Sequence, residues 1–111
     1  MSTKVFFTDL DGTLLNDQKE ITPGNQAAID EALHRGHKVV ITTGRPLASA
    51  RIQAERLGLT KEGCYIVTYN GGQIYDPYHK KTLYGKPISR KLVTPIFAEA
   101  HRRGLYIHTY S

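Results

Sequence analysis

Hydrophobic residues alternate along the first two thirds of the chain between short strand-like runs and stretches with helical spacing. Residues 4–8 form a short Val/Phe run typical of a buried strand, and residues 38–43 form a second run, β-branched at its centre. Apolar residues recur at helical spacing over residues 23–35 and again over residues 47–57. A third strand is predicted at residues 65–69. This strand–helix–strand–helix–strand order predicts an α/β fold with a parallel sheet and right-handed crossovers.

Helix ends carry residues with known capping preferences. Thr22 and Pro23 are typical of an N-cap followed by the first helical position. Gly36 and Gly58 each follow a helical stretch, where glycine commonly ends the helix in the left-handed conformation. These residues predict where the first helix begins and where the first and second helices end.

The alternation of predicted strands and helices ends after residue 72. Two short alternating segments, residues 73–76 and 81–84, predict a β-hairpin. A third helix follows, and it begins either after Ser89 or at Pro95, because a proline inside a helix removes a hydrogen bond and kinks it. Residues 105–110 are predicted to form a last strand.

Composition narrows the class of protein. The 111 residues suit one domain, and fractions of 40% hydrophobic and 23% charged residues argue against disordered, collagen-like and coiled-coil classes. No apolar run approaches the ~18–20 residues of a membrane span, and the N-terminus lacks the apolar segment of a signal peptide. The single cysteine, Cys64, cannot form an internal disulfide, so we expect a buried thiol and a cytoplasmic location.

The positive charge is concentrated in the last third of the chain. Residues 1–76 carry eight basic and nine acidic side chains, a net charge of −1, whereas residues 77–111 carry seven basic and one acidic, a net charge of +6. A basic patch can attract nucleic acid or anionic substrates. It can equally be a solvated face of a helix and hairpin, and no nucleic-acid-binding signature accompanies it.

An acidic loop directly follows the first predicted strand. Asp9 and Asp11 flank one apolar residue and are followed by Gly12 and Thr13. Two such close carboxylates favour a bound cation, and hard oxygen ligands suit Mg²⁺. A glycine lets the backbone approach an anion, whose oxygens the following amides can bind. An Asx-type turn explains only part of this five-residue string, which lies at the edge where parallel sheets bind ligands.

The string Asp-Leu-Asp-Gly-Thr-Leu-Leu at residues 9–15 resembles motif I of the haloacid dehalogenase superfamily. The resemblance implies that Asp9 is the nucleophile, forming an aspartyl-phosphate, and that Asp11 is the general acid and base. It implies Mg²⁺ bound by the Asp9 carboxylate and the Asp11 carbonyl, with Leu10, Gly12 and Thr13 in the phosphate-binding loop. The second Asp is typical of the phosphatase and phosphomutase branch.

Residues 39–46 are similar to motif II of the same superfamily. Thr43 would then donate its hydroxyl to the phosphoryl group, with the Gly44 amide beside it and a helix N-terminus just beyond. Arg45 either binds substrate, holds the loop or is a surface arginine. Taken alone, Thr43 and Gly44 would be an ordinary strand end and turn.

The strings Thr-Gly-Arg-Pro and Tyr-Asn-Gly-Gly, at residues 43–46 and 69–72, resemble the Cof-type sugar-phosphate phosphatases with a C2 cap. The implied fold is a Rossmann-like core, whose first βαβαβ half is residues 1–71, with the beginning of an inserted α/β C2 cap at residues 72–111. Asn70 either lines the substrate side or is a left-handed turn residue, which asparagine tolerates.

Two motifs that the resemblance requires, a lysine and a Gly-Asp-x-x-x-Asp string after the cap, do not occur in these 111 residues. We therefore expect the N-terminal portion of a longer protein. We also expect an unpaired strand edge and an uncovered apolar face, since half of a parallel sheet leaves both.

The predicted function is a Mg²⁺-dependent phosphatase of small phosphorylated metabolites such as sugar phosphates. A membrane or nucleic-acid partner is not expected. The alternatives are a truncated or non-catalytic fragment of this superfamily and a basic module that binds polyanions.

Overall fold

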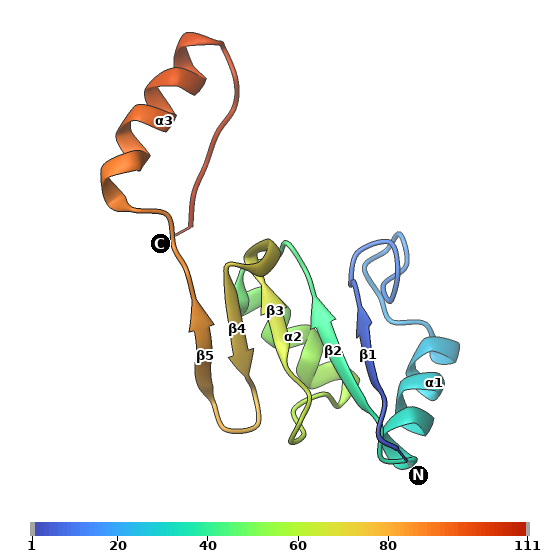
Figure 1. The fold of residues 1–111 in the computed structure, drawn as a ribbon. Helices are drawn as coiled ribbons and strands as arrows, with labels where there is room; N and C mark the ends of the chain where they lie inside the picture. The colour runs from blue at the N-terminus through green and yellow to red at the C-terminus, as the bar shows by residue number, and fades with distance from the viewer. Residues whose placement is uncertain (1, 111) are drawn as a thin grey trace.

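The computed structural model describes residues 2–110, which form five strands, three α-helices and a 3₁₀ turn (Figure 1). Strands and helices alternate as far as β3, after which a hairpin and a last helix follow. In chain order the elements are β1 (Val5–Thr8), α1 (Pro23–His34), β2 (Lys38–Thr42), α2 (Leu47–Leu57), β3 (Ile66–Thr68), the 3₁₀ turn η1 (Tyr69–Gly71), β4 (Gln73–Asp76), β5 (Lys81–Gly85) and α3 (Arg90–Arg102).

The strands form one sheet in the order β1-β2-β3-β4-β5. β1, β2 and β3 are parallel, as the βαβαβ pattern predicts, with Phe7 opposite Val40 and Ile41 opposite Ile66. β4 and β5 continue the sheet in the antiparallel direction. The three parallel strands therefore all end at the same edge of the sheet.

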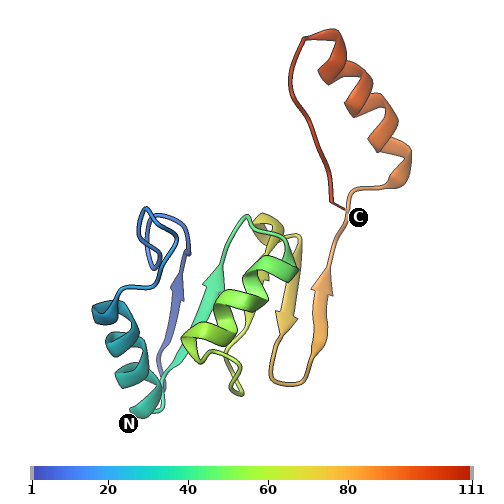
Figure 2. The ribbon, with the colours of Figure 1, turned by 180° about the vertical axis from the view of Figure 1, so that it is seen from behind.

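Both α1 and α2 pack on the same face of the sheet, as the views from opposite sides show (Figures 1 and 2). Ile29 of α1 and Ala54 of α2 join one buried cluster with Val39 and Ile41 of β2. Burying an aliphatic side chain completely stabilises a fold by roughly 1.5–3 kcal/mol, so this layer holds the parallel strands together. No helix of residues 2–110 lies on the opposite face.

The prediction of a buried first strand is wrong. Val5, Phe6 and Phe7 are 50%, 58% and 62% exposed, because β1 is the edge strand and pairs only with β2 within residues 2–110. The expectation of an unpaired edge with uncovered apolar surface is confirmed.

The predicted helix ends are confirmed where capping residues mark them. The Thr22 side chain accepts a hydrogen bond from the Asn25 amide at 3.3 Å, and α1 begins at Pro23. Gly58 ends α2 in the left-handed conformation, with φ 73°. Cys64 is fully buried, as expected.

The last part of the chain differs from two expectations. α3 begins at Arg90 with Ser89 as its N-cap, so the alternative start at Pro95 is wrong and this proline lies inside the helix. The strand predicted at residues 105–110 does not form. Among residues 2–110 no strand lies alongside this segment to pair with its backbone, and it runs extended next to α3 (Figure 1).

The hairpin joins the two predicted regions of the chain. β4 pairs with β3, so the sheet continues without a break across residue 72. α3 and residues 105–110 lie beyond the end of the sheet (Figures 1 and 2). A division between residues 1–71 and 72–111 remains a prediction. None of the helices formed by residues 2–110 has the length and apolar character that crossing a bilayer requires.

Candidate active site

The C-terminal ends of β1, β2 and β3 surround a small cavity of about 360 Å³. In open α/β sheets this edge is where ligands bind. Four residues singled out from the sequence line it together: Asp9, Thr43, Gly44 and Asn70. They come from three different strand ends, up to 61 positions apart in the numbering of the chain, and only the parallel topology brings them together.

Asp9 follows β1 directly and its side chain is exposed. Its Oδ1 accepts a hydrogen bond from the Leu10 amide at 2.7 Å. Within residues 2–110 its other oxygen, Oδ2, has no hydrogen-bond partner. One oxygen is therefore fixed and the other is free to face the cavity.

Leu10, Gly12 and Thr13 build the loop behind Asp9. The Leu10 side chain is fully buried and anchors the loop in the core. The Leu10 carbonyl accepts hydrogen bonds from the amides of Thr13 at 3.2 Å and Leu15 at 2.9 Å. Gly12 turns with φ 77°, a conformation that favours glycine. None of the three lines the cavity, so their contact with phosphate stays a prediction.

Thr43 and Asn70 are fixed by backbone contacts on either side of the cavity. The Asn70 amide donates to the Thr43 carbonyl at 3.0 Å. The Thr43 hydroxyl oxygen accepts from the Arg45 amide at 3.1 Å, which leaves the hydroxyl proton available to an anion. Asn70 has φ 54°, so it is both a left-handed turn residue and a cavity residue.

Gly44 lies tightly against Asn70. A β-carbon at position 44 would lie 3.0 Å from the Asn70 Oδ1 atom and 3.1 Å from its Nδ2 atom. Any larger residue would push the Asn70 side chain away from its present position. A β-carbon here would require the exposed Asn70 side chain to shift by a few tenths of an ångström.

Asp11 does not line the cavity, and its carboxylate binds Arg45. The guanidinium Nε lies 2.8 Å from Oδ2 and Nη2 lies 2.7 Å from Oδ1, a two-pronged ion pair. The Arg45 hydrogen bonds hold the pKa of the Asp11 carboxyl well below its usual range, against a smaller opposing effect of burial. Asp11 correspondingly raises the pKa of Arg45. Among the roles predicted for Arg45, holding the loop is the one that this geometry supports.

Three further residues complete this arrangement and were not singled out from the sequence. Lys19 Nζ lies 3.2 Å from Asp11 Oδ1, and Ser49 Oγ accepts from Arg45 Nη1 at 2.9 Å. Thr68 donates its hydroxyl to the Arg45 carbonyl. Ser49 lies one helical turn after Arg45, a spacing that could have indicated the contact. Lys19 gives no such signal, because a turn with φ 61° at this residue brings it back to Asp11.

The oxygen atoms present suit a hard cation. Within residues 2–110 no group of three or more histidine, cysteine or acidic side chains gathers into a metal site. The free Asp9 oxygen and the backbone carbonyl of Asp11 nevertheless fit Mg²⁺, which keeps several waters and often takes only one or two carboxylates from the protein. The Asp11 carboxylate fits less well, since Arg45 and Lys19 occupy it.

Residues 6–111 match the sequence profile of the haloacid dehalogenase-like hydrolases. The chain belongs to this family. Membership agrees with the resemblance found in the sequence and with the α/β fold of the structure.

Individual relatives share this part of the chain. The 5-amino-6-(5-phospho-D-ribitylamino)uracil phosphatase of Bacillus subtilis is 45% identical over 73 residues, which are 66% of this chain and 28% of that protein. The pyridoxal phosphate phosphatase of Escherichia coli is 35% identical over 83 residues, 75% of this chain and 29% of that protein. The chain thus spans less than a third of the length of these curated relatives.

A solved structure has the same arrangement of elements. A haloacid dehalogenase-like hydrolase from Bacteroides thetaiotaomicron superposes with a TM-score of 0.85 at 31% sequence identity. The match covers 99% of this chain and 41% of that one. The matching region therefore includes α3 and the segment after it, as well as the sheet.

Proposed function

We propose that this haloacid dehalogenase-like hydrolase is a Mg²⁺-dependent phosphatase of small phosphomonoesters, sugar phosphates among them, with Asp9 as the nucleophile. The observation that carries the proposal is the shared cavity of Asp9, Thr43, Gly44 and Asn70 at the ends of three parallel strands. The two relatives named above are phosphatases of small phosphorylated metabolites by their names, which supports the same class of reaction here.

Asp9 would attack the phosphorus atom with its free carboxylate oxygen. A bond forms between this oxygen and phosphorus while the bond from phosphorus to the leaving oxygen breaks, giving an aspartyl-phosphate. The Leu10 amide, 2.7 Å from Oδ1, would fix the carboxylate in position. Water would then attack the phosphorus atom and release inorganic phosphate with Asp9 restored.

Thr43, Gly44 and Asn70 would hold the transferring phosphoryl group. The Thr43 hydroxyl and the Gly44 amide are donors, and the first turn of α2 follows them in the chain. Donors fixed in advance around the phosphoryl oxygens supply most of the catalysis in phosphoryl transfer. The backbone contact between Asn70 and Thr43 keeps these groups together.

Asp11 would move the protons of the reaction. As an acid it protonates the leaving oxygen, and as a base it takes a proton from the attacking water. Arg45 holds the pKa of Asp11 low and so favours the ionised carboxylate, the form that accepts a proton. The ion pair with Arg45 must open before Asp11 can act as the acid.

A bound Mg²⁺ would neutralise charge on the phosphoryl oxygens and orient them toward Asp9. The Asp9 carboxylate and the Asp11 carbonyl are the atoms of this chain that would hold it. Asp11 would therefore contribute its backbone to the metal and its side chain to proton transfer.

The alternatives have weaker support. Arg102 and Arg103 both pair with Glu99, which neutralises part of the positive charge that a polyanion-binding module would use. A non-catalytic fragment remains the other alternative, because the lysine and acidic pair that the family resemblance requires do not occur in residues 1–111. A cytoplasmic location stays a prediction.

The proposal is tested by phosphate release from p-nitrophenyl phosphate, measured on the protein at the full length that its gene encodes. We expect release that requires Mg²⁺ and stops when EDTA removes it. Asp11→Asn should lower kcat by a factor of about 10² to 10⁴, the usual contribution of an acid-base group. Full activity in EDTA, or an unchanged rate in Asp11→Asn, would contradict the mechanism.

A further inference from the structure

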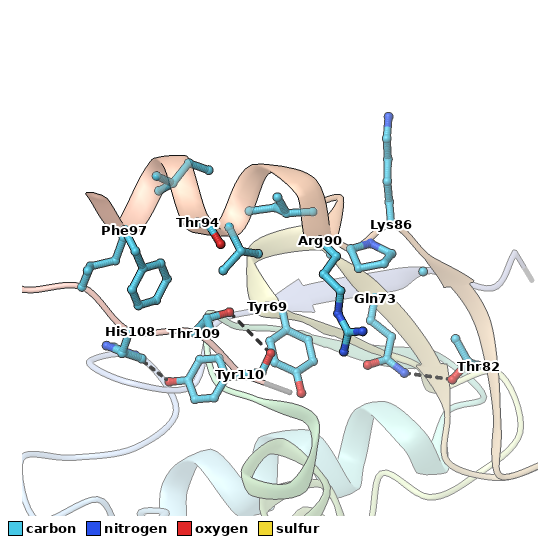
Figure 3. A pocket seen from close by; sticks show the side chains of 17 residues that line it. Tyr69, Gln73, Thr82, Lys86, Arg90, Thr94, Phe97, His108, Thr109 and Tyr110 are labelled. Atoms are coloured by element: carbon cyan, nitrogen blue, oxygen red, sulfur yellow. Dashed lines mark hydrogen bonds between the residues drawn. The ribbon is translucent and has the colours of Figure 1, made fainter. Parts of the chain in front are cut away.

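A second, larger cavity of about 860 Å³ lies between α3, the segment 105–110 and the end of the sheet (Figure 3). This volume lies within the usual range of small-molecule sites. Its walls are mostly apolar and include several aromatic rings. The residues that carry the argument are Tyr69, Gln73, Arg90, Phe97, His108 and Tyr110.

Tyr69 connects this cavity to the small one that contains Asp9. Tyr69 lines the larger cavity, and Asn70 and Gly71, which follow it directly, line the smaller one. The Tyr69 amide donates to the Arg45 carbonyl at 3.2 Å. The two cavities therefore share one short turn, η1, and the Tyr69 side chain lines the larger cavity from this turn.

The backbone of this turn is in an unusual conformation. Tyr69 and Asn70 both have φ 54°, although each carries a β-carbon. Left-handed conformations of such residues are uncommon, and a tyrosine in one points to a constraint from its surroundings. Retained backbone strain of this kind clusters at ligand sites. Here it directs an aromatic ring into a cavity.

The Tyr69 ring has aromatic neighbours from the last segment of the chain. Its centroid lies 5.7 Å from that of Tyr110, and the His108 ring lies 5.3 Å from Tyr110 in an edge-on arrangement. Figure 3 shows Phe97 extending from α3 toward the same rings. These distances are those of favourable aromatic pairs, so a further flat ring entering the cavity would find suitable partners.

A cation lies beside the rings. The Arg90 guanidinium extends from the start of α3 into the space between Tyr69 and Gln73 (Figure 3). No carboxylate of residues 2–110 forms a salt bridge with it. Guanidinium groups stack on aromatic faces, so Arg90 would cover a ring that enters from the phosphoryl site.

We propose that the larger cavity binds the leaving group of the phosphomonoester, that the preferred leaving group carries an aromatic ring, and that Tyr69 is the residue that selects it. The proposal rests on the proposed function, since it requires the phosphoryl group to lie against Asp9. It narrows the substrate class from phosphorylated metabolites in general, including sugar phosphates, to those with a flat ring.

Three probes test it by binding, in Mg²⁺, to the full-length gene product carrying Asp9→Asn, which lacks the nucleophile and so leaves the esters intact. They are inorganic phosphate and two esters of similar size, phenyl phosphate and cyclohexyl phosphate. The amide signals of Asn70 and Gly71 report binding by NMR. We expect all three to shift these signals, and phenyl phosphate to bind about three- to tenfold more tightly than cyclohexyl phosphate.

Variants identify the residue responsible. Tyr69→Leu should abolish the preference for phenyl phosphate and leave the affinity for inorganic phosphate unchanged, which also shows that the variant is folded. Tyr69→Phe should keep the preference. Tyr78→Leu is the matched control, because Tyr78 is 51% exposed in the β4–β5 turn, outside both cavities.

Failure of the aromatic proposal can be distinguished from failure of the proposed function. Equal affinities of phenyl and cyclohexyl phosphate, or a preference that survives in Tyr69→Leu, would overturn the aromatic proposal alone. If inorganic phosphate and both esters leave Asn70 and Gly71 unshifted, the phosphoryl site itself is refuted, and the proposed function falls together with this inference.

Discussion

Arg45 forms a two-pronged ion pair with Asp11, 34 positions earlier in the chain, with nitrogen–oxygen distances of 2.7 and 2.8 Å. The pair joins the loop after β1 to the loop after β2. It therefore couples two strand ends that the proposed reaction uses together.

Removing the guanidinium tests this coupling. Arg45→Met should raise the pKa of Asp11 toward that of an ordinary carboxyl, because its main hydrogen-bond donor is lost. NMR titration of the Asp11 side-chain carboxyl carbon measures the change. Arg35→Met, which removes an exposed pair with Glu31 on α1, is the control and should leave Asp11 unaltered. An Asp11 pKa that stays low in Arg45→Met would contradict the assignment.

The same pair predicts a pH dependence of stability. The folded-state pKa of Asp11 is depressed, so the stabilisation is present above the ordinary carboxyl pKa and is lost as the pH falls through the lower folded value. The difference in unfolding free energy between wild type and Arg45→Met should be constant above pH ~5 and shrink below pH ~4. We expect less than about 1 kcal/mol at pH 7, because the pair is partly exposed. Urea unfolding of both proteins at several pH values measures this free-energy difference. A difference that grows as the pH falls would contradict the predicted pH dependence.

The contact between Gly44 and Asn70 gives a third prediction. Gly44→Ala should lower the unfolding free energy by up to about 1 kcal/mol, because its β-carbon forces the exposed Asn70 side chain to move by a few tenths of an ångström. Gly44→Ala with Asn70→Ala should recover much of this loss. Gly24→Ala is the control: a β-carbon there meets nothing within 4 Å, and alanine in α1 should stabilise slightly. Equal effects of the two glycine variants in thermal unfolding would contradict the close approach.

The exposed edge strand of the sheet, β1, gives a fourth prediction. Phe7→Ala should cost less than about 1 kcal/mol, because Phe7 is 62% exposed, whereas Ile41→Ala at the fully buried centre of β2 should cost about 2–5 kcal/mol. Urea unfolding of both variants tests this. A large loss at Phe7 would show that another surface covers β1.

Local signals in the sequence were sufficient for most of the fold. Thr22, Gly58 and the β-branched residues of β2 each mark a boundary or an element through their own conformational preferences. The exposure of Phe6 and the missing strand at residues 105–110 could not be predicted in this way. Both depend on which neighbour lies alongside the backbone, which a single segment does not encode.

The residues of the candidate site likewise fall into those that the sequence predicts and those that it does not. Asp9, Thr43 and Asn70 stand at strand ends, so parallel topology alone predicts their meeting at one edge. Lys19 and Thr68 have no such signal. The Lys19 contact depends on a turn with φ 61°, and Thr68 donates to the Arg45 carbonyl from strand β3. The Asp11–Arg45 pair could not be predicted, because the sequence does not show that the loops after β1 and β2 bring these two side chains together.

The most direct test of the central claim is the identification of the residue that becomes phosphorylated. The full-length gene product is mixed with p-nitrophenyl phosphate and Mg²⁺, quenched in acid and digested, and its peptides are examined by mass spectrometry. We predict a phosphoryl group on Asp9 that is absent from Asp9→Asn, together with a fall of about a thousandfold or more in turnover. A phosphoryl group on another residue, or wild-type turnover by Asp9→Asn, would contradict the account.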